Sequence, residues 1–421
     1  MKKELHKVRL RISSIGNFRK LNMSDKANGD CSDLRAVCNV ILSAIGIGIL
    51  SLPMSFASGG WIGGIFTMLI GVLVPNTAVL KLFYSIRNQD SKSIVNSYEA
   101  LGTEIGGRKL GIFTACVVHI TITGCCSALL LMIGKCISDL VPALTPRWST
   151  IASGVFLVPC CWLRSLHEVG YISAIGTLSI LALLVVIVIA GLTSTSFTSP
   201  SRAVIIYDFH AFSLSLCVAV FSFNIANTVP TLVHDMRNPQ RFPKVAIAGA
   251  FSIFFINLSI CAAAYLGWGD LLSTRDTIMD FLFESAVPGL GKTAVVFILL
   301  MAIPHYIVLF IPVANAAELI LPAFQLRLIL TRTILVGVTV LVAITVPDIK
   351  TIINVLGAFT MSFIALILPV LFYVTTRWRQ GLHLEIADRV TCGFILIIAM
   401  FLLTFGGYTA VAKAISDAAR I

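Results

Sequence analysis

Two glycines separated by one residue interrupt a long apolar segment near the start of the chain, which reads Ala44-Ile45-Gly46-Ile47-Gly48-Ile49-Leu50 and is followed by Pro53. Glycines and a proline inside a membrane helix free backbone groups that lipid cannot satisfy, so protein or a polar cavity must do so. Unpaired N–H groups at the start of a half-helix attract a carboxylate, and unpaired carbonyls attract an ammonium group. We therefore predict that Ile45, Gly46, Ile47 and Gly48 bind a small dipolar solute through their main chain.

A second apolar segment is interrupted in a similar way, at Phe221-Ser222-Phe223-Asn224-Ile225-Ala226-Asn227-Thr228-Val229-Pro230. Asn224 and Asn227 are three residues apart and are expected to share a helical face, one turn before a proline that removes a backbone donor. We predict that both asparagines contribute to the site and that Phe221 or Phe223 covers the solute. The competing interpretation of each interruption is a kinked structural helix at a close span–span contact.

Two histidines are candidates for proton coupling, because imidazole changes its charge near physiological pH. His119 and His305 are the histidines placed deepest in the predicted spans. A sodium site would need carbonyl and hydroxyl oxygens, yet residues 294–321 offer Asn315 and no Ser or Thr. Protons are therefore favoured over sodium. The eleven cysteines lack metal-ligand or disulfide spacing, so we predict no metal and no cofactor.

The elements that would position these residues are membrane-spanning helices. Hydrophobic residues make up 57% of the 421 residues, charged residues make up 12%, and the mean hydropathy is +0.94. A bilayer core needs roughly 20 apolar residues per helix. About eleven stretches meet this need, at 34–56, 61–83, 110–141, 148–163, 169–192, 212–233, 245–266, 293–321, 328–346, 349–374 and 390–408. We predict an all-α polytopic membrane protein.

The two interruptions lie five spans apart, which is typical of transporters built from inverted repeats with a site at the bilayer midplane. We expect a basic tail at residues 1–33 and a transmembrane transporter domain at 34–421. Repeat one would occupy about 34–192, repeat two about 212–374, and an extra helix about 390–411.

The net charge of +11 reports membrane topology and not nucleic-acid binding, because most Lys and Arg residues fall in alternate joins. The positive-inside rule then places the N-terminus in the cytosol. The expected partners are the lipid bilayer, a small-molecule substrate and a proton or sodium ion, with no nucleic acid.

Several motifs resemble those of the amino acid/auxin permease family, in the family's order. They are Asn39 with 46–56 and Gly60-Trp61, then 97–102, 163–170, 238–244, 265–270 and 357–359. The resemblance covers nearly everything after residue 33. It implies a five-plus-five inverted-repeat (LeuT-type) fold with eleven spans, and amino acid transport driven by protons or sodium. Ile47 stands where the family usually has a small residue, and Leu42 where many members have asparagine, which implies a tighter, more apolar pocket.

The leading hypothesis is a secondary active amino acid transporter, in the plasma membrane or a vacuolar or lysosomal membrane. Alternatives are a sodium-coupled transporter and an amino acid sensor that signals through its basic tail. Tyr207-Asp208 and Gly267-Trp268-Gly269-Asp270 are similar to motifs of intramembrane aspartyl proteases, but both aspartates are expected at span ends beside loops, so we predict no enzyme. The predicted spans contain no ring of like charges, and this argues against a channel.

Overall fold

The computed structural model describes residues 31–88, 97–162, 169–194, 208–275, 277–285, 287–320, 327–346 and 348–418. The predicted tail before residue 31 lies outside this part, as do the side chains of Leu42 and Asn315. The described residues form helices and no strand, and eight helical segments are long and apolar enough to cross a membrane. The predicted all-α polytopic class is therefore confirmed.

The helices that make up the body of the protein are α2 (Asp33–Ala44), α3 (Gly48–Ala57), α4 (Gly60–Arg87), α5 (Tyr98–Leu140), α6 (Pro146–Cys161), α7 (Val169–Leu192), α8 (Phe209–Ser222), α9 (Val229–Asp235), α10 (Phe242–Trp268), α11 (Met279–Phe283), α12 (Leu290–Ile320), α13 (Arg327–Thr345), α14 (Ile349–Ala358), α15 (Leu368–Arg379), α16 (Ile386–Phe401) and α17 (Gly407–Ala418). Short 3₁₀ turns η2 (Ala226–Thr228), η3 (Pro239–Arg241) and η4 (Gly269–Thr274) join some of them, and π-helical turns η5 (Ser362–Ile367) and η6 (Leu402–Gly406) join others.

Each predicted span coincides with one of these helices or with a pair of them. The first is divided into α2 and α3, and the sixth into α8 and α9. The number of membrane crossings and the inverted repeat stay predictions.

Two glycines with positive φ shape the helix boundaries. Gly60, at φ 68°, makes the sharp turn between α3 and α4, and Gly107, at φ 71°, kinks α5. Side chains with a Cβ rarely adopt this region of backbone conformation, whereas glycine enters it freely. The kink separates the first turns of α5 from the segment predicted to span the membrane.

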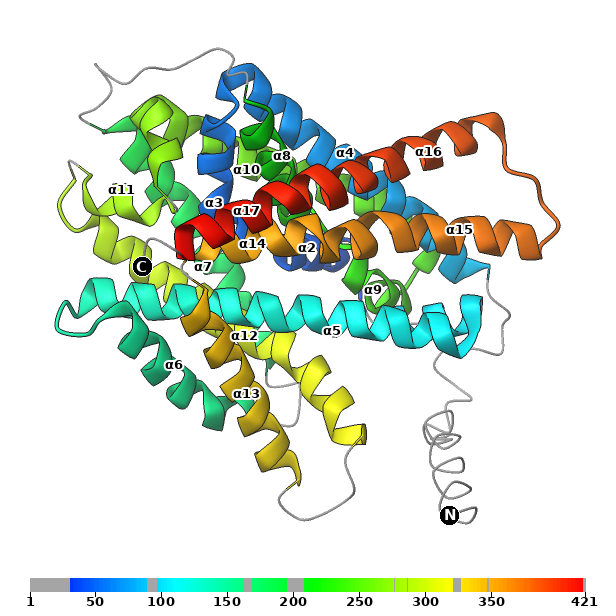
Figure 1. Cartoon of the computed structure of the whole chain (residues 1–421), viewed down its shortest axis with the longest axis horizontal. Helices are drawn as coiled ribbons and strands as arrows, with labels where there is room; N and C mark the ends of the chain where they lie inside the picture. Colours follow the sequence, from blue (N-terminus) through cyan, green and yellow to red (C-terminus); the bar gives the residue numbers. More distant parts are fainter. Residues whose placement is uncertain are drawn as a thin grey trace.

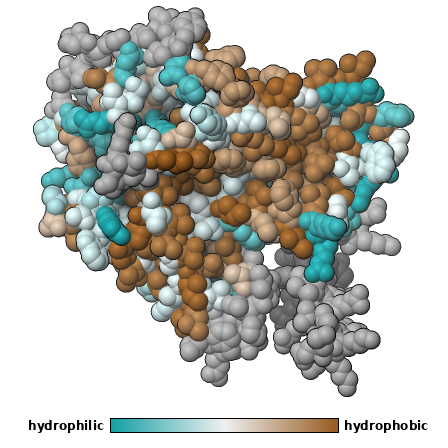
Figure 2. Space-filling view, viewed as in Figure 1, coloured by the Kyte–Doolittle hydropathy of each residue, from teal (hydrophilic) through white to brown (hydrophobic). Residues whose placement is uncertain are grey.

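Long helices pack side by side around α12, which contacts α5 and α7, while α10 contacts α2, α4 and α7. Figure 1 shows α5 crossing the molecule lengthwise beside α14 and α15. On this face hydrophobic side chains cover the middle, and hydrophilic ones gather towards the two ends (Figure 2). This distribution suits a protein surrounded by lipid.

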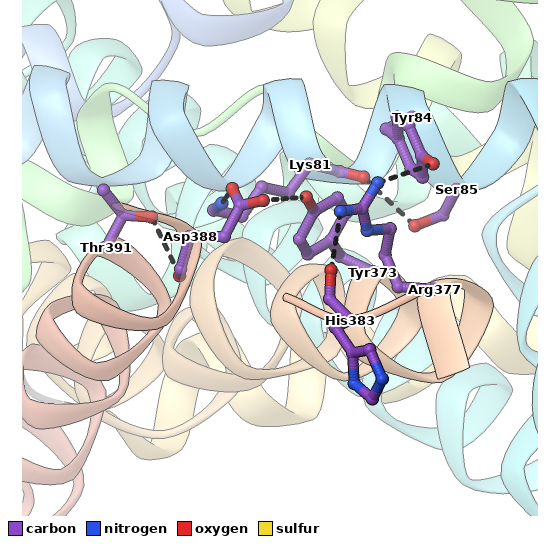
Figure 3. Close-up of polar contacts among 8 residues, drawn as sticks. All are labelled: Lys81, Tyr84, Ser85, Tyr373, Arg377, His383, Asp388 and Thr391. Atoms are coloured by element: carbon purple, nitrogen blue, oxygen red, sulfur yellow. Dashed lines mark hydrogen bonds and ion pairs between the residues drawn. The ribbon is translucent and has the colours of Figure 1, made fainter. Parts of the chain in front are cut away.

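The hairpin between α15 and α16, which Arg377, Arg379 and Arg389 flank, meets the ends of α4 and α5 at one end of the molecule. Lys81 Nζ lies 2.9 Å from Asp388 Oδ1, and Arg379 donates to the carbonyl of Glu104 at 3.0 Å. Figure 3 shows Lys81 and Tyr373 directed at the carboxylate of Asp388. The ends of α4 and α5 and the hairpin between α15 and α16 are thus linked.

Candidate functional site

The interruption of the first span occupies three residues. Helix α2 ends at Ala44, and Ile45 has extended backbone angles (φ −80°, ψ 95°). Helix α3 begins at Gly48, and the N–H groups of Ile47 and Gly48 donate to no described residue. Two backbone donors therefore stand at the N-terminus of a half-helix, the arrangement that binds anions.

The two glycines of this interruption touch different neighbours. A Cβ on Gly46 would lie 2.9 Å from Cε1 of His305 on α12. A Cβ on Gly48 would lie 2.2 Å from Oγ of Ser222, the last residue of α8. The absence of side chains at both positions therefore lets the main chain approach α12 and α8 closely.

The sixth span is interrupted between Ser222 and Ala226. Asn224 lies within this gap, where its Oδ1 accepts from the N–H of Ala226 at 3.0 Å and its Nδ2 lies 3.2 Å from Sδ of Met361. The side chain is buried. Its described contacts shape the turn and attach it to the segment before η5.

The other predicted residues of the sixth span point to different neighbours. Asn227 is half-buried within η2, and because the chain is not α-helical from Phe223 to Ile225, the face shared with Asn224 that helical spacing predicts does not form. Phe223 is buried, with its ring close to Gly71 of α4. Phe221 is half-buried and packs between two hydrophobic clusters. Ser222, which the sequence analysis did not select, is the residue that meets Gly48.

The two candidate histidines are separated by the fold. His305 lies against Gly46, is half-buried, and forms no hydrogen bond with any described residue. His119 lines a groove among α5, α12, α13, α14 and α17. Only His305 therefore contacts the interruption of the first span.

A short segment covers the start of α3. The N–H of Ile278, just before α11, donates to the carbonyl of Leu50 at 3.2 Å, and Ile278 is fully buried. Lys135 of α5 lies 2.9 Å from Asp280 and donates to Thr277 at 3.4 Å. These contacts hold the segment before α11 against the first turn of α3.

The start of α2 is attached to the far end of the sixth span. Cys31 donates its N–H to the carbonyl of Asp235 at 3.1 Å and accepts from the N–H of Arg237 at 2.9 Å. Asp33 pairs with Arg241 at 3.0 Å. Burial raises the pKa of the Cys31 thiol, which therefore stays protonated at neutral pH.

The two aspartates of the protease-like motifs have separate local roles. Asp208 caps α8 by accepting from the N–H groups of His210 and Ala211. Asp270 accepts from the hydroxyl of Tyr265 at 2.5 Å. Among the described residues, no group of three His, Cys, Asp or Glu is placed to hold a metal ion.

Comparisons with known proteins agree with this architecture. A family model described as "Transmembrane amino acid transporter protein" matches residues 30–412. The chain is 24% identical to amino acid transporter AVT1E of Arabidopsis thaliana over 435 residues, which cover 96% of this chain and 80% of that protein. It is also 24% identical to the human vesicular inhibitory amino acid transporter over 377 residues, which cover 81% of this chain and 69% of that protein.

Proposed function

The chain belongs to the transmembrane amino acid transporter family, and from this membership we propose that it is a proton-coupled amino acid transporter that works by alternating access. The observation that carries the proposal is the interrupted first span, which leaves two N–H groups free and whose Gly46 lies against His305. The relatives compared above are transporters by name, and this fits a role other than catalysis.

The substrate site that we propose is the segment from Ile45 to Gly48. The carboxylate of an amino acid binds the N–H groups of Ile47 and Gly48, where the dipole of α3 favours negative charge. The carbonyl of Ile45 accepts no backbone hydrogen bond from the described residues and suits the ammonium group. Phe221 and Asn227 are half-buried and remain candidates for contact with the substrate side chain, whereas Phe223 and Asn224 support the turn from behind.

His305 is the residue that we propose for proton coupling. Its imidazole lies against Gly46 and has no hydrogen-bonding partner among the described residues. A protonated imidazole there would make a charge-assisted hydrogen bond with the substrate carboxylate. Substrate and proton would then stabilise each other in the site, which is the thermodynamic requirement for coupled transport.

The attachments of the first span support alternating access. Helix α3 is tied to the segment before α11 by the bond between Ile278 and Leu50, and α2 is tied to the end of α9 through Cys31. The two halves of one span are therefore held by different parts of the molecule. Each half has its own contacts to break when the site opens to one side of the membrane.

Uptake by purified protein in proteoliposomes tests the function. A panel of amino acids is offered with a pH gradient alone, a sodium gradient alone, or neither. We expect accumulation of at least one amino acid with the pH gradient alone. Accumulation driven only by sodium would refute proton coupling, and no accumulation or exchange of any amino acid would refute transport.

The role of His305 is tested by His305→Gln, with His383→Gln as the control because only the main-chain carbonyl of His383 makes a described contact, with Arg377. We expect His305→Gln to retain exchange of labelled for unlabelled substrate but to lose accumulation driven by the pH gradient. The control variant should keep both. Normal proton-driven accumulation in His305→Gln would assign the coupling to another group.

A further inference from the structure

A groove of about 800 Å³ lies apart from the interrupted spans, where α5, α12, α13, α14 and α17 meet. These helices come together on the face turned towards the viewer in Figure 1. Its volume is typical of small-molecule sites, which are mostly apolar with a few polar groups. Its walls are formed mainly by aliphatic side chains, among them Leu335, Val355, Leu356 and Val411.

Four polar side chains line the groove, and two of them are already satisfied. The hydroxyl of Thr345 donates to carbonyls of its own helix, and that of Thr351 donates to Asp348. The side chains of His119 and Thr123, by contrast, form no hydrogen bond with any described residue. Nδ1 of His119 is fully buried, so a ligand in the groove can bond only with Nε2 of this imidazole.

The two unsatisfied residues are neighbours. His119 and Thr123 are four residues apart on α5, so their side chains share one face of the helix. Polar groups in an apolar setting cost free energy unless they find a partner, and lipid tails offer none. Other threonines of α5 donate to the carbonyl four residues earlier, as Thr121 does to Val117. Thr123 lacks this bond, which leaves its hydroxyl available to a ligand beside the imidazole.

We propose that this groove binds a membrane sterol, whose single hydroxyl bonds with His119 and Thr123 while its apolar body lies along the aliphatic walls. The groove lies among predicted spans, where such a molecule can reach it from the bilayer. Its described lining includes no Lys, Arg, Asp or Glu, so it offers no partner of fixed charge for a phosphate or carboxylate. An uncharged amphiphile with one hydroxyl group matches this combination.

The test is photolabelling of the full chain in phosphatidylcholine nanodiscs with a photoreactive sterol, followed by mass spectrometry of the labelled peptides. We expect label on peptides of α5 and α14, and displacement by unlabelled sterol. The double variant His119→Leu/Thr123→Val should be labelled about tenfold less, as expected for two lost hydrogen bonds. Thr345→Val is the matched control, because it lines the same groove with a hydroxyl already bonded to its own helix; its labelling should not change.

A second variant keeps the test decisive if the polar substitutions disturb folding. Val411→Trp on α17 fills the groove without altering His119 or Thr123, and it should also reduce labelling. Equal labelling of wild type and both variants would overturn the proposal. So would displacement of the probe by diacylglycerol or fatty acid but not by sterol, which would assign the groove to another lipid.

Discussion

At the scale of single residues, a side chain added at Gly46 would meet different neighbouring atoms from one added at Gly48. The atom nearest to a Cβ on Gly46 belongs to the imidazole of His305, which can rotate. A Cβ on Gly48 would meet Ser222 at Oγ, Cβ and also Cα, the last at 3.1 Å. The second contact involves main chain and cannot relax as easily.

We therefore predict that Gly48→Ala impairs uptake more than Gly46→Ala. Overpacking of a close contact costs about 1–3 kcal/mol, and here it would push α3 away from α8. Adding Ser222→Gly removes the two nearest atoms and should restore part of the uptake to the Gly48→Ala variant. Initial uptake rates, normalised to protein in the membrane, measure this. Equal loss in both single variants, with no rescue, would contradict the explanation.

Some contacts of the candidate site could not be predicted from the sequence. Glycines and prolines indicate where a helix ends, because their effect on the backbone is local. Whether His119 or His305 reaches Gly46 depends on how α5 and α12 pack, which residue types do not specify. The spacing of Asn224 and Asn227 misled because helical periodicity does not apply where the helix has stopped.

At the scale of elements, the hairpin between α15 and α16 is fastened by a partly buried polar network. The side chain of Lys81 is 9% exposed and that of Asp388 is 26% exposed, and Tyr373 donates to Asp388 at 2.6 Å. Beside them Arg377 donates to Tyr84 and to the main chain of the hairpin (Figure 3). Lys81 and Asp388 are 307 residues apart, so no sequence motif connects them.

We predict that Asp388→Asn destabilises the protein, because it leaves the Lys81 ammonium group without its charge partner. Breaking a buried pair costs about 3–5 kcal/mol, and the partial exposure of Asp388 favours the lower value. Thermal unfolding in detergent measures the effect, with Glu284→Gln as the control because Arg275 and Glu284 form an exposed pair worth about 0–1 kcal/mol. The double variant Lys81→Met/Asp388→Leu should recover most of the loss. Similar melting of Asp388→Asn and the control would show that the network is not structural.

The segment around α11 should open more often when its ion pair is lost. Asp280→Asn removes the charge that faces Lys135 at 2.9 Å, while the bond from Ile278 to Leu50 remains. In a cysteine-free background with the reporter Thr277→Cys, we expect faster reaction with a membrane-impermeant maleimide. Glu284→Gln serves again as the control. An unchanged rate would mean that the hydrophobic contacts of Ile278 and Phe281 alone keep the segment closed.

At the scale of the whole molecule, two kinds of sequence pattern account for most of the fold. Long apolar runs give the positions of the spans, since each must satisfy its backbone within one helix to cross lipid. Basic residues in alternate joins indicate which helix ends lie on the same side of the membrane. The contact of Arg379 with Glu104, for example, links the end of α15 to the start of α5. The sequence does not specify the angles between helices or the groove beside α17, because these depend on side-chain packing over the whole chain.

Orientation in the membrane yields a further prediction. If the basic end is cytosolic, a glycosylation sequon inserted in the exposed turn between α5 and α6, at 141–145, should be modified in the endoplasmic reticulum. A sequon in the hairpin at 380–384 should stay unmodified. A glycosidase-sensitive shift in electrophoretic mobility reports the result. Modification of the sequon at 380–384 alone would show that the protein has the opposite orientation in the membrane.

The attachment of Cys31 to residues 235 and 237 consists of main-chain atoms only. Replacing the side chains at these positions therefore leaves both hydrogen bonds possible, and an alanine scan would pass over this attachment unnoticed. Evolution is equally free to vary the three residues while the junction persists. Only proline removes a donor outright, either at position 31, as in Cys31→Pro, or at position 237, as in Arg237→Pro. An attachment of this kind depends on the course of the main chain, so no sequence motif would reveal it.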